Sequence, residues 1–180
     1  MPSELRLVRQ VAIPSQSAIA TAFKSTNLAD AFSIQLPADA SVDPEVLARF
    51  IFSVQPPWIG ALTSLRDGIV AGFGLKTAKH LARLSSDPKA KRISIFRVFG
   101  NTDTEVVLGE NDRHLDFRLS VLCTQSPPPS TGSQLTLTTV VHCHNRLGQI
   151  YLSVIAPFHR QVVKASLRSA ADVGWPKANA

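Results

Sequence analysis

The part of the chain that most constrains the fold is residues 92–156, where short segments of alternating apolar and polar residues follow one another. Alternation with a period of two indicates a β-strand with one buried face. Turns or one Pro-Ser-Gly loop separate the segments, and such short connections predict an antiparallel meander. The predicted strands are RISIFRVFG (92–100), TEVVLGE (104–110), HLDFRLSVLC (114–123), SQLTLTTVVHCH (133–144) and GQIYLSVIA (148–156).

Helical patterns lie on either side of this run. An earlier strand, DAFSIQLP (30–37), is followed by a helix for which Asp43 is the predicted N-cap and Pro44 the first helical residue. A second helix is predicted over WIGALTSLRDGIVAGFG (58–74), and a long C-terminal helix over PFHRQVVKASLRSAADV (157–173).

This order of elements predicts an α+β fold, because the helices are segregated from the meander. The simplest arrangement is a curved antiparallel sheet of about six strands, with two shorter helices after the first strand and the long C-terminal helix closing the sheet. That is the helix-grip arrangement. A chain of 180 residues fits one domain, which we expect over residues 1–174, with residues 175–180 as a flexible tail.

The segments LRDGIVAGFGL, GENDRHLDFRLS and HCHNRLGQIYLSVIAPFHRQVV, with the DAFSIQLP strand, resemble an uncharacterised bacterial family of domains of unknown function, number 2867. The resemblance covers roughly residues 8 to 170. It implies a relation to the START-like, polyketide-cyclase-like (SRPBCC) helix-grip superfamily, and therefore a ligand cavity under the C-terminal helix. It implies no reaction and no catalytic residue, because relatives on this fold include carriers, receptors and enzymes.

Composition narrows the choice of compartment and partner. The N-terminus has no continuous apolar stretch of a signal peptide, and no apolar run approaches the ~20 residues of a membrane span. We therefore expect a cytoplasmic protein with reduced cysteines, no membrane contact and no cofactor. The net charge of +6 gathers in KTAKHLARLSSDPKAKR (76–92), which has no aromatic residue on which a base could stack. A solvated basic segment is favoured over a nucleic-acid site.

Side-chain alternation assigns the histidines to one sheet face. Leu115, Phe117 and Leu119 should share the apolar face with Val141 and Cys143. The opposite face should carry a polar cluster, and with NRLG as a hairpin turn it would also bring Tyr151 beside His142. The members of the polar cluster are His114, Asp116, Arg118, His142 and His144.

The same alternation bears on metal and cysteine chemistry. His142 and His144 have chelating spacing, but a zinc site needs a third protein ligand, and Cys143 points to the other face. We predict no metal site and no reactive thiolate. Glu110 and Asp112 flank a turn, so they serve turn geometry or form a polar cluster at a cavity mouth. His159 and Arg160 either cap the joint between sheet and helix, or Arg160 holds an anionic group of a ligand.

Three functions compete. The first is binding of a small apolar or amphipathic molecule between the sheet and the C-terminal helix. The second is a cyclase- or hydrolase-type enzyme with His and Asp or Glu as acid and base, which requires such a pair to face the cavity. The third is an interaction module, for example a homodimer, that uses the polar face. The candidate ligand-binding residues are Trp58, Phe73, Phe117, Leu119, Tyr151, Phe158 and Arg160.

Overall fold

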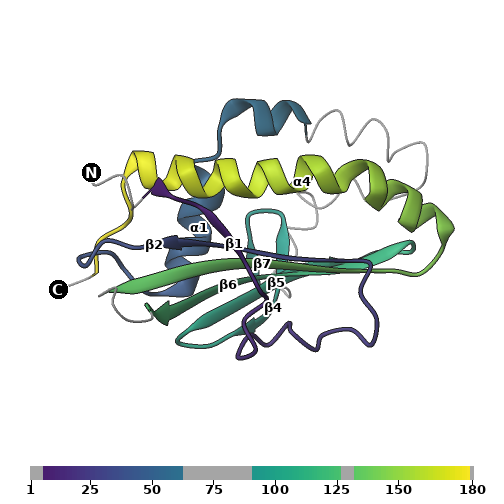
Figure 1. Cartoon of the computed structure of the whole chain (residues 1–180), viewed down its shortest axis with the longest axis horizontal. Coiled ribbons are helices and arrows are strands. Elements are labelled where there is room, and N and C mark those ends of the chain that lie inside the picture. The colour runs from purple at the N-terminus through teal and green to yellow at the C-terminus, as the bar shows by residue number, and fades with distance from the viewer. Residues whose placement is uncertain (1–5, 63–90, 127–131, 179–180) are drawn as a thin grey trace.

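The fold is one antiparallel sheet of seven strands crossed by a long C-terminal helix (Figure 1). The structure is a computed structural model and describes residues 6–62, 91–126 and 132–178. The strand order is β1-β2-β7-β6-β5-β4-β3. The elements are β1 Arg9–Val11, β2 Leu28–Gln35, α1 Pro44–Ser53, β3 Arg92–Ile93, β4 Phe96–Asn101, β5 Glu105–Asn111, β6 Leu115–Gln125, β7 Ser133–Cys143 and α4 Arg146–Val173.

The predicted meander is confirmed from β3 to β7, since each strand pairs antiparallel with the next one along the chain. The predicted strand at 92–100 is divided into β3 and β4 by a tight turn, in which Ser94 has a φ of 55°. β2 then pairs with β7, and β1 adds to β2 at the edge. The predicted α+β class is therefore correct, and the sheet has more strands than expected.

The predicted strand at 148–156 is wrong, because these residues belong to α4. The Asn145 side chain is the N-cap and accepts a hydrogen bond from the Gly148 backbone N–H at 3.1 Å, so NRLG is a helix start and not a hairpin turn. Pro157 lies inside α4, where its missing N–H interrupts the helical hydrogen-bond ladder. Figure 1 shows α4 bending in its N-terminal half, as a proline inside a helix favours.

Residues 12–27 cover the sheet face opposite α4 (Figure 1). Ile19 is buried there against Val107 and Val140. The buried Glu105 carboxylate accepts hydrogen bonds from the Ser17 hydroxyl at 2.5 Å and from the Ser120 hydroxyl. The sheet face that the alternation predicted to carry the polar cluster is therefore partly covered by the chain's own N-terminal segment.

Helix α1 begins as predicted, with Asp43 as its N-cap and Pro44 in the first turn. Residues 57–62 are helical, and the remainder of the predicted second helix, with Phe73, lies outside the described residues. Trp175 is buried in the main core against Phe50, and the Ser41 backbone N–H donates to the Pro176 carbonyl at 2.7 Å. Residues 175–178, assigned to a tail by the sequence analysis, thus pack against the domain in the structure.

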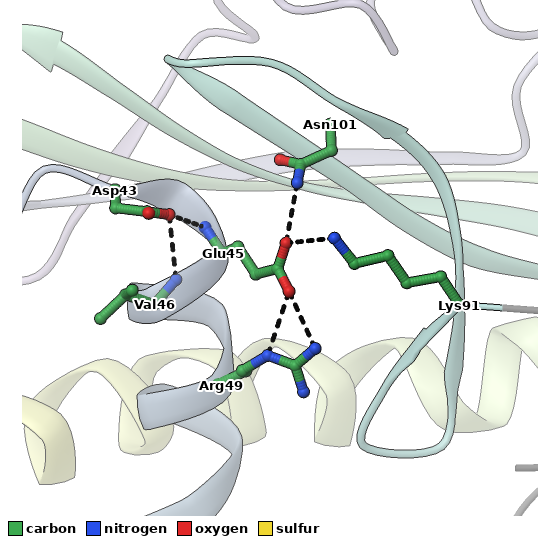
Figure 2. Close-up of polar contacts among 6 residues, drawn as sticks. All are labelled: Asp43, Glu45, Val46, Arg49, Lys91 and Asn101. Atoms are coloured by element: carbon green, nitrogen blue, oxygen red, sulfur yellow. Dashed lines mark hydrogen bonds and ion pairs between the residues drawn. The ribbon is translucent and has the colours of Figure 1, made fainter.

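Glu45 links α1 to the sheet through hydrogen bonds and ion pairs (Figure 2). Its carboxylate accepts hydrogen bonds from Lys91 Nζ at 2.5 Å, from Asn101 Nδ2 at 2.8 Å and from Arg49 Nη2 at 2.8 Å. The hydrogen bond from Lys91, followed by that from Arg49, lowers the pKa of Glu45 from its ordinary value of 4.5. The ionised carboxylate therefore stabilises the folded state above about pH 4.5, and this contribution is lost as the pH falls through the lowered pKa.

Replacing Glu45 with glutamine is expected to lower the free energy of unfolding at pH 7 by at most about 1 kcal/mol, because exposed ion pairs are screened by water. The difference from wild type should shrink as the pH falls from 5 to 3, in urea titrations at each pH. Asp103→Asn, in the exposed β4–β5 turn, is the control and should show no such convergence. A Glu45→Gln deficit that is constant across this pH range contradicts the assignment.

Candidate functional site

A cavity of about 370 Å³ lies between the sheet and the N-terminal half of α4. Its walls come from β2, from β4 to β7, from the end of α1 and the helical residues 57–62, and from α4. The sheet contributes Leu28, Leu115, Phe117, Leu119, Leu137 and Val141. Helix α4 contributes Tyr151, Leu152, Ile155, Phe158, Val162 and Val163. Most of the lining is aliphatic or aromatic, and the space falls in the roughly 300–1,000 Å³ range of small-molecule sites.

The position of the cavity follows from where α1 ends. In the C-terminal half of α4, Leu167 and Ala170 share a fully buried cluster with Leu47 and Ala48 of α1. Towards the N-terminus of α4 this helix support ends at Ser53. The apolar stripe of α4 continues there without α1 beside it, and the space beneath it is not filled.

One wall of the cavity carries a buried polar group built from β2, β7 and α4. The Asp30 side chain is only 1% exposed, and its Oδ2 accepts a hydrogen bond from Arg160 Nε at 3.3 Å. His159 Nε2 lies 3.5 Å from the other oxygen, Oδ1. Thr139, which lines the cavity with His159, is the cross-strand partner of Asp30. We call Asp30, Thr139 and His159 the polar pole.

A second buried ion pair borders the cavity. Glu110 and Asp112 both line the cavity, and Glu110 pairs with Arg92 at 3.1 Å. Arg92 also donates to the Ile95 carbonyl at 2.7 Å, which ties the β3–β4 turn to this pair. The sequence left open whether Glu110 and Asp112 serve the turn or the cavity. In the structure both acids line the cavity, and both also lie next to the β5–β6 turn.

Four of the predicted ligand-binding residues line the cavity: Phe117, Leu119, Tyr151 and Phe158. Trp58 is 43% exposed and does not line it. Arg160 is not part of the lining, and its Nε contacts Asp30 Oδ2 at 3.3 Å. Phe73 lies outside the described residues.

The predicted polar cluster is divided between two places. Asp116, Arg118 and His142 lie on the sheet face away from the cavity, as the alternation predicts. His144 Nε2 contacts Asp116 Oδ1 at 3.1 Å, and His142 Nδ1 lies 2.9 Å from the Ser25 carbonyl. His114 lies in the β5–β6 turn, where its Nδ1 faces the Asn145 side chain. The predicted contact of His142 with Tyr151 is wrong, because Tyr151 is in α4 and His142 pairs with Asp116 across the sheet.

The two cysteines are buried and free. Burial raises the pKa of Cys123 to about 12 and also raises the pKa of Cys143. Neither thiol is ionised near neutral pH, so neither is an activated nucleophile. Within residues 6–62, 91–126 and 132–178, no three His, Cys, Asp or Glu side chains are placed to hold a metal ion together.

The polar pole could not be predicted as a unit from the sequence. Asp30 had a readable signal, because it has the same strand parity as Phe32, Ile34 and Leu36 and so places a carboxylate on a buried apolar face. His159 was considered only with Arg160, as a cap or an anion site. Its pairing with Asp30 joins α4 to β2 across 129 positions of sequence, and no local pattern reports such a contact.

Together these features define an α+β domain with an apolar cavity beneath its terminal helix. The chain belongs to the family described as protein of unknown function (DUF2867), which matches residues 22–166. No curated protein and no solved structure matches the chain. In the part of the chain that the structure describes, no helix is long and apolar enough to cross a membrane.

Proposed function

We propose that the protein binds a small apolar or amphipathic molecule in the cavity beneath α4, as a helix-grip domain of the START-like kind. The observation that carries this proposal is an apolar cavity of about 370 Å³ next to a cluster in which Leu47, Ala48, Leu167 and Ala170 are fully buried. An unfilled apolar space forgoes the dispersion contacts that a packed core makes. A ligand of matching shape restores those contacts and removes its own apolar surface from water, at about 25 cal/mol per Å².

Helix α4 offers a matched pair of positions for a test. Val163 lines the cavity and is buried, whereas Val173 is 64% exposed at the helix end and lies outside the lining. Val163→Phe should fill part of the cavity and weaken binding of the uncharged fluorescent probe N-phenyl-1-naphthylamine by at least about tenfold, which corresponds to about 1.4 kcal/mol. Val173→Phe should bind the probe as the wild type does.

Native mass spectrometry of freshly purified wild-type protein gives a second readout, since a retained ligand appears as a mass difference that Val163→Phe loses. Overpacking costs about 1–3 kcal/mol, so the folded fraction of Val163→Phe must be checked by circular dichroism. The proposal fails if the wild type binds neither the probe nor a copurified molecule. It also fails if both variants bind the probe equally.

One observation favours a second candidate, an enzyme with acid–base chemistry. His159 lines the cavity and lies 3.5 Å from Asp30, so one member of a His–Asp pair is placed where acid–base chemistry on a bound molecule requires it. It ranks second because Asp30 is already engaged by Arg160. Chemical change of a bound molecule, lost in His159→Gln with binding retained, would favour this reading over simple binding.

A further inference from the structure

The polar pole holds several buried polar atoms with unused hydrogen-bonding capacity. Among the described residues, Thr139 Oγ1 is buried without a hydrogen-bond partner, and Asp30 Oδ1 and His159 Nε2 have only their ion-pair contact with each other, at 3.5 Å. Buried polar side-chain atoms in folded proteins nearly always have a partner, and those that lack one need an explanation. Here Thr139 and His159 line the cavity, and Asp30 contacts His159 and is the cross-strand partner of Thr139.

We propose that the ligand carries an uncharged hydroxyl group that binds at the polar pole, while its apolar part fills the rest of the cavity. This inference rests on the proposed binding function. A hydroxyl both donates and accepts. It can donate towards the Asp30 carboxylate or Thr139 Oγ1 and accept from Thr139 or from a protonated His159 Nε2. A single hydroxyl group of the ligand can therefore satisfy the hydrogen-bonding capacity of Thr139 and His159 that the protein itself does not satisfy.

The charges at the site select against an ionised ligand. The Asp30 carboxylate is already balanced by the Arg160 guanidinium, at 3.3 Å. A ligand carboxylate would add a second negative charge beside a nearly fully buried one, and the acids that line the cavity, Asp112 and the Arg92-paired Glu110, offer it no positive partner. A ligand ammonium would leave a buried net positive charge and would lose its hydration in an apolar space. A hydroxyl adds no charge, and its desolvation cost is offset by the hydrogen bonds it makes.

The test compares three ten-carbon compounds that differ only in the polar end: 1-decanol, decanoate and decylamine. Each displaces N-phenyl-1-naphthylamine from the wild-type chain at pH 7. We expect 1-decanol to bind at least about tenfold more tightly than either ionised compound, because burying an unpaired charge costs far more than burying a hydroxyl. Equal or tighter binding of decanoate or decylamine overturns the proposal.

Strand β7 provides a control for the protein side. Thr139 and Thr138 are adjacent, both are buried, and both have a hydroxyl without a partner among the described residues, but only Thr139 lines the cavity. Thr139→Val should weaken 1-decanol binding by roughly three- to tenfold, the worth of one neutral hydrogen bond. Thr138→Val should leave it unchanged. Thr139→Ser keeps the hydroxyl and should retain the wild-type preference for 1-decanol. It replaces Thr139→Val as the test variant if Thr139→Val folds poorly.

The outcomes separate this inference from the proposed function. If the wild type binds the probe but 1-decanol shows no advantage, the cavity is a binding site and the hydroxyl assignment is wrong. The assignment is also wrong if Thr138→Val and Thr139→Val weaken 1-decanol binding equally. If the wild type binds no probe at all, the proposed function itself fails, and this inference fails with it.

Discussion

Replacing Arg160 with methionine should lower the free energy of unfolding by about 3 kcal/mol, because it leaves the buried Asp30 carboxylate without its counterion. Removing one partner of a buried ion pair costs about 3–5 kcal/mol, and we expect the lower end because the Arg160 side chain is 46% exposed. Methionine preserves the apolar stem of arginine, so the change isolates the charge and the hydrogen bond at 3.3 Å. Urea unfolding followed by circular dichroism measures the difference.

A double-mutant cycle with Asp30→Asn distinguishes the ion pair from local packing. In the Asp30→Asn background the penalty of Arg160→Met should fall well below its value in the wild type, since no buried charge remains to be compensated. Arg168→Met, at an exposed position of the same helix, is the matched control and should change stability by less than about 0.5 kcal/mol. Equal losses for Arg160→Met in both backgrounds would show that the pair carries no coupling.

The strands of the meander could be predicted from sequence because their two faces have different surroundings. In β6, Leu119 and Val121 face the core, and Ser120 faces the Glu105 cluster under residues 12–27. This difference between the two faces produces the alternation of apolar and polar residues in the sequence. Residues 12–27 themselves have no regular period, so their position across the sheet could not be predicted, although they bury Ile19.

The first turns of α4 were predicted as a strand because exposed apolar residues there alternate with polar ones as they would in a strand. Ile150 and Val154 are 63% and 54% exposed, and with Leu152 between them they produce apparent alternation. Tyr151, Leu152 and Ile155, which line the cavity, are spaced as on a helix. Pro157 then suggested a boundary where the helix in fact continues. The alternation and the proline both favour a boundary near residue 157, but the packing of a long helix over the sheet determines the structure here.

The candidate site was predictable only in its apolar part. Phe117, Leu119 and Phe158 could be placed near a cavity because the order of elements predicted a sheet closed by a terminal helix. The polar pole depends on contacts between β2 and α4 and on the register of β2 with β7. Such pairings are determined by tertiary structure and are not encoded in a local sequence pattern. The one local signal here is an acidic residue on the buried face of β2.

Leu167→Ala should lower the free energy of unfolding by about 2–5 kcal/mol, because Leu167 is fully buried where α4 packs on α1 and the sheet. A truncation there creates a new void in a close-packed cluster. Leu152, on the same helix, is also buried but has the cavity on one side, so it has fewer neighbours to lose. Leu152→Ala is therefore expected to cost at least about 1 kcal/mol less than Leu167→Ala, for the same number of removed atoms.

The two substitutions should also differ in their effect on ligands. Leu152→Ala enlarges the cavity and should alter the affinity for N-phenyl-1-naphthylamine, whereas Leu167→Ala should leave that affinity unchanged in the folded fraction. Urea unfolding and probe titration on the same preparations separate the two effects. If Leu152→Ala destabilises the protein as much as Leu167→Ala, the N-terminal half of α4 is as tightly packed in solution as the C-terminal half. The cavity would then be closed in the free protein, and a ligand would have to open it at a cost in affinity.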